Sequence, residues 1–319
     1  MRLAVTGLGS FIGLRAIEAL LETNPDQVIV GLDLQLPASL EGRIVFRPVD
    51  LTGPTADGRI AEILREQRCD AVLHTAFFGT PQSDVEYAHE LEVVGSLHLL
   101  NAIGATGIEK LVVMSSAEVY GAHPDNPNFL TEQHALRGNP DSHAVSDRIE
   151  VERLVRLFAR RHPLVRAATL RPVAVVGPSI RNRFTRYFGA RTATTLLGYD
   201  PLMQFLHEDD LVDAVLLALA RDLSGPFNLA GAGVLPLSTL LRLAGKRNWP
   251  CPHPLLYSLR YLDSVARTSD PPQAFYDYLR FLWVVDASRA ARELGFAPLY
   301  TSKEAWMSFV VSRKLEVYG

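Results

Sequence analysis

A glycine-rich segment near the N-terminus has the residue types and spacing that bind a phosphate group. Three glycines, Gly7, Gly9 and Gly13, come directly after an apolar run, and a helical pattern over residues 11–22 follows. Glycine allows a sharp turn and a close approach to a ligand, and the first N–H groups of a helix attract phosphate oxygens. The segment therefore predicts a diphosphate cradle that comprises Gly7, Gly9, Ser10, Phe11, Ile12 and Gly13.

An acidic residue follows at the distance that a dinucleotide site requires. Asp33 ends a second apolar run, about twenty residues after Gly13. A carboxylate at this point accepts hydrogen bonds from the adenosine ribose hydroxyls. It would repel the 2′-phosphate of NADP, and the next residue, Leu34, supplies no cation to offset the repulsion. We therefore expect the cofactor to be NAD.

The elements that must position these residues alternate along the first half of the chain. Short apolar runs are separated by stretches long enough for a helix, which is typical of strands buried on both faces of a parallel sheet. Right-handed crossovers then give an α/β fold with a Rossmann-type doubly wound sheet. The predicted strands are residues 3–5, 28–30, 44–46, 71–73, 111–114 and 167–170, and residues 227–229 are expected to return to the sheet.

Two longer helices are predicted downstream, over residues 147–162 and 207–221. The first has apolar side chains along one face, and the second is apolar nearly all round. Beyond Pro172 the alternation ends and the helical segments are short. We expect an NAD-binding domain of residues 1–171, to which 202–230 return, and a smaller, mostly helical substrate-binding lobe of residues 172–201 and 231–319.

Composition excludes several classes of protein. The 319 residues carry a formal net charge of -3, which argues against nucleic-acid binding, and the basic runs 160–162 and 181–183 are interpreted as solvated loops or helix ends. Cys69 and Cys251 form no CxxC pair, so neither a disulfide scaffold nor a metal site is expected. Glycines interrupt the first ten residues, and no run approaches the ~18 apolar residues of a membrane span. These features predict a cytoplasmic protein.

Further motifs are spread over nearly the whole chain, and together they resemble the extended short-chain dehydrogenase/reductases of the NAD-dependent epimerase/dehydratase family. The first is TGLGSFIG at 6–13, although Ser10 stands where the family's TGxxGxxG has its second glycine and Gly9 supplies one a position earlier. The others are Asp50-Leu51, HTAF at 74–77, VGSLHLL at 94–100 with Glu92 in place of the usual Asn, MSSAEVYG at 114–121, LRPVAVVGP at 170–178, FLHEDD at 205–210, FNL at 227–229 and LGFAP at 294–298.

The resemblance implies roles for individual residues. In the family, the Asp-Leu pair borders the adenine, the fourth strand's motif lies beside the cofactor, and the loop at the proline of LRP borders the nicotinamide. A Ser or Thr four residues before a Tyr bonds the reacting substrate oxygen, which points to Ser116, with Tyr120 as a packing residue. His207, Asp209 and Asp210 are expected to open a structural helix rather than to bind a metal. The corresponding cofactor residues here are Asp50, Leu51, Thr75, Ala76, Phe77 and Pro172.

One departure concerns the family's chemistry, which rests on a YxxxK motif. The matching stretch, residues 141–152, contains no tyrosine. Alignment on residues 150–154 puts Ala144 in the Tyr position and Arg148 in the Lys position, where a permanent cation still contacts the ribose. A shift by one residue puts His143 and Asp147 there instead. We prefer the first alignment because it needs no gap.

Two residues are therefore candidates for the general acid/base that transfers the proton. His143 carries an imidazole, the side-chain group that most often serves as a general acid/base, and Glu118 retains the second member of the Asp-Glu pair found in dehydratases of the family. The structural interpretations are that His143 lies where a helix begins and that Glu118 is solvated or structural.

Two main functions compete, and a third option is a structural subunit that pairs with an active homologue through the two long helices. The first is an NAD-dependent epimerase/dehydratase-like oxidoreductase that acts on a nucleotide sugar or another bulky hydroxyl or keto substrate with a non-standard acid/base. The second is a non-catalytic NAD-binding regulatory or sensor protein. The resemblance also implies a homodimer.

Overall fold

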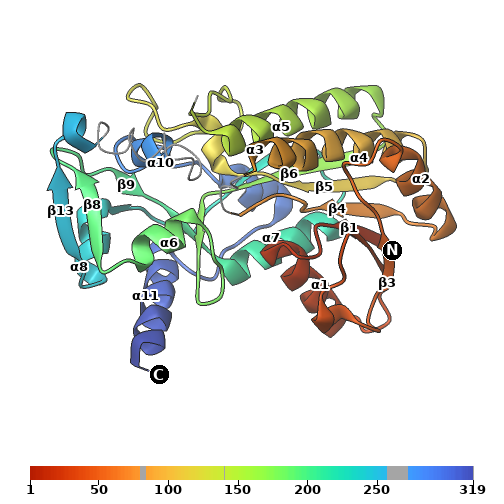
Figure 1. The fold of residues 1–319 in the computed structure, drawn as a ribbon, viewed down its shortest axis with the longest axis horizontal. Coiled ribbons are helices and arrows are strands. Elements are labelled where there is room, and N and C mark those ends of the chain that lie inside the picture. The colour runs from red at the N-terminus through yellow and green to blue at the C-terminus, as the bar shows by residue number, and fades with distance from the viewer. Residues whose placement is uncertain (80–83, 140, 257–271, 319) are drawn as a thin grey trace.

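The protein has an α/β architecture built on one central sheet (Figure 1). The computed structural model describes residues 1–79, 84–139, 141–256 and 272–318. Within them, seven strands pair in parallel in the order β11-β6-β5-β4-β1-β2-β3, which confirms the predicted sheet and the return of residues 227–229 to it. The strands are β1 Leu3–Thr6, β2 Ile29–Asp33, β3 Val45–Pro48, β4 Ala71–His74, β5 Lys110–Met114, β6 Arg166–Pro172 and β11 Gly225–Leu229.

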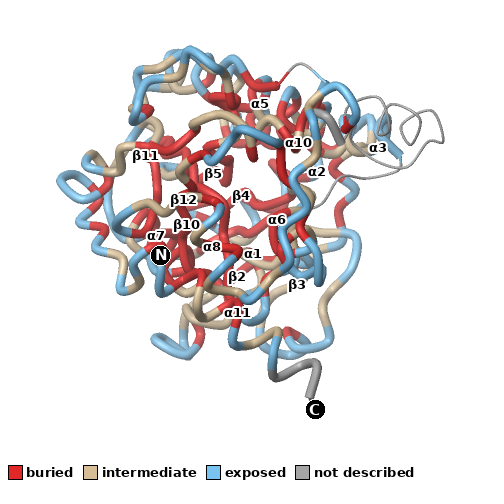
Figure 2. The backbone as a smooth tube through the Cα atoms, turned by 90° about the vertical axis from the view of Figure 1, so that its left-hand side faces the viewer, coloured by how far each residue is buried: buried red, intermediate tan, exposed pale blue. Residues whose placement is uncertain are grey.

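Helices cover both faces of the sheet, as a doubly wound fold requires. In Figure 1, α2, α4 and α5 lie on one side of the sheet, and α1 and α7 lie on the other. Each side has its own apolar cluster, and the tube in Figure 2 shows the buried strands between them. These helices, with the short α3, are α1 Phe11–Thr23, α2 Ala56–Glu66, α3 Val85–His89, α4 Gly95–Gly104, α5 His143–Arg161 and α7 Glu208–Ala220.

Helix α5 begins four residues before the predicted start at position 147. Its first turn is stabilised by Val145 and Ile149, which lie on one face and pack against Val119. Because Val119 belongs to the short helix η3 Ala117–Tyr120, this contact also fixes η3 against α5. The predicted start of the helix was wrong because the first turn is stabilised by a contact with Val119, which is distant in sequence and comes close only in the folded chain.

The C-terminal part contains helices, as predicted, and also strands that were not predicted. The unpredicted strands form three two-stranded sheets among the described residues, and Pro250 explains why one of them was missed, since proline is tolerated only at sheet edges. No helix in the described ranges is long and apolar enough to cross a membrane. The elements are β7 Ala174–Val176 with β10 Phe205–His207, β9 Leu202–Met203 with β12 Leu235–Pro236, β8 Thr192–Leu196 with β13 Arg247–Cys251, and helices α6 Arg183–Gly189, α8 Leu237–Leu243, α10 Pro272–Asp277 and α11 Ser302–Tyr318.

A polar network is buried beneath the carboxyl ends of β5 and β6. Arg171 is fully buried and donates to both carboxylate oxygens of Glu152, with Nε–Oε1 and Nε–Oε2 distances of 2.9 and 3.1 Å. Its Nη1 also donates to the Tyr120 hydroxyl at 2.7 Å, and that hydroxyl donates to Asn228 at 2.8 Å. Burial raises the pKa of Tyr120 to about 12, although Arg171 lowers it in part. Tyr120 is therefore a neutral packing residue, as predicted.

We expect Glu152→Gln to lower the free energy of unfolding by about 3–5 kcal/mol, because it leaves the Arg171 guanidinium buried without its counter-charge. Urea denaturation followed by circular dichroism measures the change. The matched control is Glu62→Gln, which removes an exposed pair with Arg59 and is expected to cost about 1 kcal/mol or less. Equal losses in the two variants would contradict the role given to the buried pair.

Candidate functional site

A cavity of about 740 Å³ lies at the carboxyl ends of the central strands. Its walls include the residues that directly follow β1, β2, β4, β5 and β6, and the strand order reverses between β1 and β4. Ligands of doubly wound folds bind at this kind of switch point, and the volume is in the usual range for small-molecule sites. The predicted site residues that line the cavity are Gly7, Gly9, Ser10, Phe11, Ile12, Asp33, Asp50, Leu51, Thr75, Ala76, Phe77, Ser116, Glu118, Arg148 and Pro172.

The glycine segment forms a tight loop between β1 and α1. Gly7 has a φ of +77°, and a Cβ there would lie 2.5 Å from the backbone nitrogen of Ala76. A Cβ on Gly13 would lie 2.4 Å from the carbonyl oxygen of Gly7, so Gly13 serves the packing of α1 and does not line the cavity. Ser10, which replaces the family's glycine, caps α1 by accepting from the Gly13 N–H at 3.0 Å.

Gly9 differs from the other two glycines of this loop. A Cβ on Gly9 would meet no atom within 4 Å, so the packing of the chain does not require a glycine there. Gly9 lines the cavity together with Phe11 and Ile12 of the first turn of α1. Open space in front of a helix N-terminus is where a diphosphate is bound in Rossmann folds. The loop therefore fits the predicted diphosphate.

Asp33 is held in position by the glycine loop itself. Its Oδ2 accepts the Leu8 N–H at 2.7 Å, and its Oδ1 accepts the Leu34 N–H at 2.7 Å. A carboxylate oxygen can accept two hydrogen bonds, so each oxygen retains capacity for a ribose hydroxyl. The carboxylate at the end of β2 fits an adenosine ribose, which is the predicted role.

The opposite wall is fixed by the residues that follow β4. Thr75 Oγ1 donates to the carbonyl oxygen of Thr6 at 2.7 Å, which ties this wall to β1. His74 is buried and lies between the Thr6 and Ser96 hydroxyls, at 2.6 and 2.8 Å. Burial lowers the pKa of His74 to about 3, so its ring is neutral at physiological pH. His74 therefore has a structural role and holds β4 to α4.

Helix α5 turns Arg148 toward the cavity, as the preferred alignment requires. Asp147, its counterpart in the other alignment, hydrogen-bonds to His89 Nδ1 at 2.7 Å and is not among the cavity-lining residues. This hydrogen bond raises the pKa of His89. Ala144, in the position of the family's tyrosine, does not line the cavity either.

Arg148 and Glu92 hold the same residue of the cavity wall. Arg148 Nη2 donates to the carbonyl oxygen of Phe78 at 2.8 Å, and its guanidinium carbon lies 5.8 Å from the centroid of the Phe77 ring. The buried Glu92 accepts the N–H of Phe78 at 2.8 Å. Two of the positions at which the chain departs from the family pattern, 92 and 148, thus converge on Phe78.

The structure brings two of the three catalytic candidates together. Ser116 and Glu118 both line the cavity, and Ser116 Oγ lies 3.2 Å from the Glu118 nitrogen and 3.4 Å from Glu118 Oε2. His143 is the first residue of α5, is exposed, and does not line the cavity. The structure therefore does not bring His143 to the other two.

Arg183 is a residue of the site that the sequence analysis missed. Its guanidinium forms an ion pair with Glu118, and the two side chains are only 11% and 14% exposed. The guanidinium carbon also lies 5.1–5.7 Å from the ring centroids of Phe184, Phe275 and Tyr278. The interpretation of the run 181–183 as solvated was wrong for Arg183, because its partners are distant in sequence. Only the adjacent Phe184 offered a local signal.

Tyr278, in the C-terminal part of the chain, is buried behind this wall and does not line the cavity. Its hydroxyl donates to the carbonyl oxygen of Glu118 at 2.9 Å. Burial raises the pKa of Tyr278 well above its usual value, so the phenol stays neutral. The site thus offers a serine hydroxyl, a carboxylate and a guanidinium side by side, which suits hydrogen bonding to a substrate oxygen and exchange of its proton.

Comparisons with known proteins agree with the fold and the cofactor. Residues 3–230 match the model of the NAD dependent epimerase/dehydratase family, in agreement with the prediction of NAD. An uncharacterized protein of Mycobacterium tuberculosis is 30% identical over 319 residues, which cover 98% of this chain and 84% of the relative. UDP-glucose 4-epimerase 2 of Oryza sativa subsp. japonica is 29% identical over 254 residues, which cover 68% of this chain and 60% of the relative.

Two solved structures show the same fold. The UDP-glucose 4-epimerase of Thermotoga maritima, solved with UDP-glucose, has a TM-score of 0.74 and 18% identity, with 99% of this chain and 100% of that chain covered. The dTDP-glucose 4,6-dehydratase of Bacillus anthracis, in complex with NAD, has a TM-score of 0.72 and 16% identity, with 99% and 97% covered. These matches confirm the predicted Rossmann-type fold.

Gly9→Ala separates cofactor binding from folding at the loop. We expect the free energy of unfolding to change by about 1 kcal/mol or less, because the added methyl group meets open space. We expect the affinity for NAD to fall about tenfold or more, a cost of about 1.4 kcal/mol, because the methyl group takes up room beside the diphosphate. Urea denaturation and titration calorimetry with NAD measure the two quantities.

The matched control is Gly58→Ala in α2, which also adds a methyl group to open space but lies away from the cavity. It is expected to leave NAD affinity unchanged. Wild-type NAD affinity in Gly9→Ala would show that the diphosphate does not lie against this glycine.

Proposed function

Because the chain belongs to the NAD-dependent epimerase/dehydratase family, we propose that it is an NAD-dependent oxidoreductase acting on a nucleotide sugar or another bulky hydroxyl or keto substrate, with Glu118 as its acid/base. The observation that carries the proposal is that one cavity joins the glycine loop and Asp33 to the Ser116–Glu118 pair. The names of the relatives, which include UDP-glucose epimerases, support the substrate class.

The proposal gives each part of the cavity a ligand group. Asp33 binds the adenosine ribose, the loop from Gly7 to Ile12 binds the diphosphate, and Asp50 with Leu51 borders the adenine. Arg148, Phe77 and Pro172 border the nicotinamide end, with Thr75 and Ala76 along the wall between. Residues 1–171 and 202–230 form the NAD-binding domain, and residues 172–201 and 231–319 form the substrate-binding lobe.

The chain's own residues have to handle a proton. Ser116 donates a hydrogen bond to the reacting substrate hydroxyl's oxygen, and the Glu118 carboxylate accepts the proton as the C–OH group becomes C=O. NAD held by the glycine loop and Asp33 would supply a reversible hydride acceptor for the same carbon. Glu118 returns the proton when the carbonyl is reduced, so atoms and charge balance over the cycle. A carboxylate is a base near neutral pH without a neighbouring cation, whereas a phenol with a pKa near 10 is not.

A second candidate function has its own supporting observation. Glu118 is paired with Arg183, Arg148 is bonded to Phe78, and Ala144 has no proton to give. In a non-catalytic NAD-binding protein, these contacts would serve the stability of a cavity whose occupancy regulates a partner. In both cases we propose a homodimer, which sedimentation equilibrium tests.

The deciding experiment uses the purified full-length chain. It is saturated with NAD and incubated with UDP-glucose, UDP-glucuronic acid or dTDP-glucose. Absorbance of reduced nicotinamide and chromatography of the sugar nucleotides then report oxidation and product formation. Turnover supports the enzyme. Binding of NAD by calorimetry without turnover of any of the three supports the regulatory function, and failure to bind NAD contradicts both.

Glu118→Gln removes the proposed base. We expect kcat to fall by about 10²-fold or more, because the amide cannot accept the substrate proton, while the Kd for NAD stays within about twofold. Glu118→Asp keeps a carboxylate and is expected to retain part of the activity. The measurements are steady-state kinetics on the sugar nucleotide that turns over and calorimetry with NAD. Wild-type kcat in Glu118→Gln would exclude Glu118 as the base.

His143→Ala is the matched control for the other candidate. Because the His143 side chain is exposed and does not line the cavity, we expect kcat and KM within about twofold of wild type. A large loss of kcat in this variant, measured in the same assay, would return the proton-transfer role to His143.

A further inference from the structure

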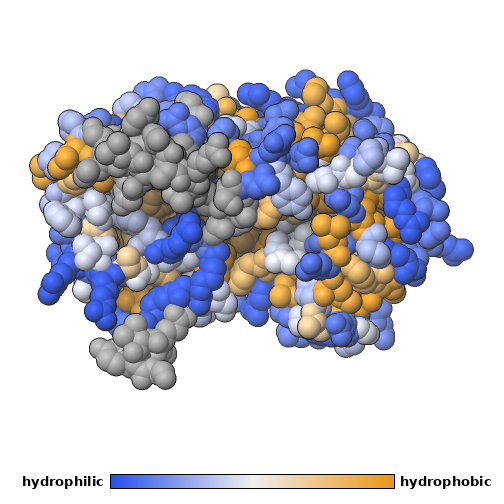
Figure 3. Space-filling model, in the orientation of Figure 1, coloured by the Kyte–Doolittle hydropathy of each residue, from blue (hydrophilic) through white to orange (hydrophobic). Residues whose placement is uncertain are grey.

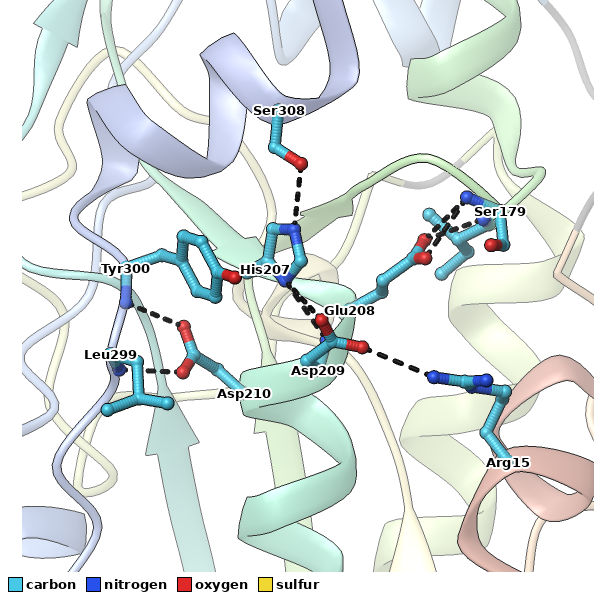
Figure 4. Close-up of polar contacts among 10 residues, drawn as sticks. Arg15, Ser179, His207, Glu208, Asp209, Asp210, Leu299, Tyr300 and Ser308 are labelled. Atoms are coloured by element: carbon cyan, nitrogen blue, oxygen red, sulfur yellow. Dashed lines mark hydrogen bonds and ion pairs between the residues drawn. The ribbon is translucent and has the colours of Figure 1, made fainter. Parts of the chain in front are cut away.

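Three carboxylates open α7, and each holds a different segment of the chain (Figure 4). His207 caps the helix by accepting the N–H of Asp209 at 3.2 Å. Negative charge at a helix N-terminus is favourable, but this explains neither the number of carboxylates nor their partners. Asp209 reaches Arg15 of α1 at 3.3 Å, whereas Glu208 and Asp210 both bind backbone N–H groups of loops.

Glu208 holds the loop that leads to the cavity wall. The residue is 3% exposed, and its carboxylate accepts the N–H of Ser179 at 3.0 Å and the N–H of Ile180 at 2.7 Å. A Cβ on Gly177 would lie 2.4 Å from this carboxyl group, so the loop passes directly against it. Hydrogen bonds from backbone N–H groups to a buried carboxylate are about twice as strong as neutral ones.

The carbonyl side of the same loop is held by an arginine. Arg181 Nη1 donates to the carbonyl oxygens of Pro178 and Ser179 at 2.9 and 3.0 Å. Asn182 then caps α6 by accepting from Thr185, and its Nδ2 donates to the carbonyl oxygen of Val175 at 2.8 Å. Consecutive residues of this segment are therefore fixed by contacts with both their N–H and their C=O groups.

Arg183 follows directly and begins α6. Because residues 179–182 are fixed, the position of the Arg183 backbone is fixed too, and its guanidinium reaches Glu118. We propose that Glu208 is a positioning residue: by holding Ser179 and Ile180, it sets Arg183 against Glu118 at the cavity wall. The catalytic consequence rests on the proposed function, whereas the mechanical coupling does not.

Asp210 provides a matched control from the same helical turn. It is also buried, and its carboxylate accepts the N–H groups of Leu299 and Tyr300 at 2.7 and 3.2 Å. That loop does not line the cavity. Glu208→Gln and Asp210→Asn therefore remove the same chemistry from two loops, of which only one leads to the site.

The first measurement is hydrogen exchange, which needs no activity. In each wild-type site two backbone N–H groups point at a carboxylate, which accepts both hydrogen bonds. The amide that replaces it has only one accepting oxygen, and its NH2 group is itself a donor. Each variant therefore loses one hydrogen bond and places its NH2 group against a backbone N–H. We expect the amides of Ser179 and Ile180 to exchange about tenfold faster in Glu208→Gln, with Leu299 and Tyr300 unchanged, and the reverse pattern in Asp210→Asn. Wild-type exchange at 179–180 in Glu208→Gln, or equal acceleration there in both variants, would overturn the proposal.

The second measurement tests whether the loop transmits its position to Glu118. Tm shifts are compared for Glu208→Gln, Glu118→Gln and the double variant. Residues coupled through shared structure give non-additive shifts, so the Glu118→Gln shift should be smaller in the Glu208→Gln background. The Tm shifts of Glu118→Gln and Asp210→Asn should add up in the variant that carries both substitutions. Additivity in both pairs would contradict the coupling.

Catalysis is tested with UDP-glucose as the probe. We expect kcat of Glu208→Gln to fall about 10- to 100-fold, because a displaced Arg183 no longer orients Glu118, while the Kd for NAD and the kcat of Asp210→Asn stay within about twofold. An unchanged kcat would overturn the positioning role. Absence of turnover in the wild type would count against the proposed function alone, since exchange and Tm still decide the coupling.

If Glu208→Gln fails to fold, Gly177→Ala reaches the same contact from the loop, because its methyl group displaces the Glu208 carboxyl group. It should reproduce the faster exchange at Ser179 and Ile180, and wild-type exchange there would contradict the proposal.

Discussion

The buried ion pair between Glu152 and Arg171 is the interaction on which the geometry of the cavity depends. It joins α5 to β6, and through Ser115 and Tyr120 it also holds the end of β5 and the turn that follows. Opposite charges removed from water are tolerated only when further hydrogen bonds satisfy both groups. The network supplies these bonds, and in doing so it fixes the floor of the cavity from elements that are far apart in the sequence.

The same pair sets the rotation of α5. Residues four apart lie on one helical face, so a Glu152 that points to β6 places Arg148 and then Ala144 along that face. Arg148, with Glu92, holds Phe78, and Ala144 carries no polar group. Arg148 and Glu92, which occupy positions of the family's motifs, therefore support the part of the cavity wall that contains Phe78. The groups suited to proton transfer, Ser116 and Glu118, lie just after the end of β5. On the face of the molecule that Figure 3 shows, apolar and polar residues lie side by side at the surface.

The sheet and the glycine loop could be predicted because their signals are local: each strand is a continuous apolar run, and the loop is a short motif. Sequence spacing does not separate a glycine needed by a ligand from one needed by packing, and only the Cβ geometry distinguishes Gly9 from Gly13. The first turn of α5 and the role of Arg183 were missed for a different reason. Each depends on a partner far along the chain, Val119 in one case and Glu118 in the other.

The Glu118–Arg183 pair gives the proposed proton transfer a direction. When Glu118 takes the substrate proton, its ion pair with Arg183 is lost, and the pair forms again when the proton is given back. That suits a cycle in which the proton is returned to the same substrate after the hydride. It would not suit a reaction that ends with Glu118 protonated, because the pair would then stay broken.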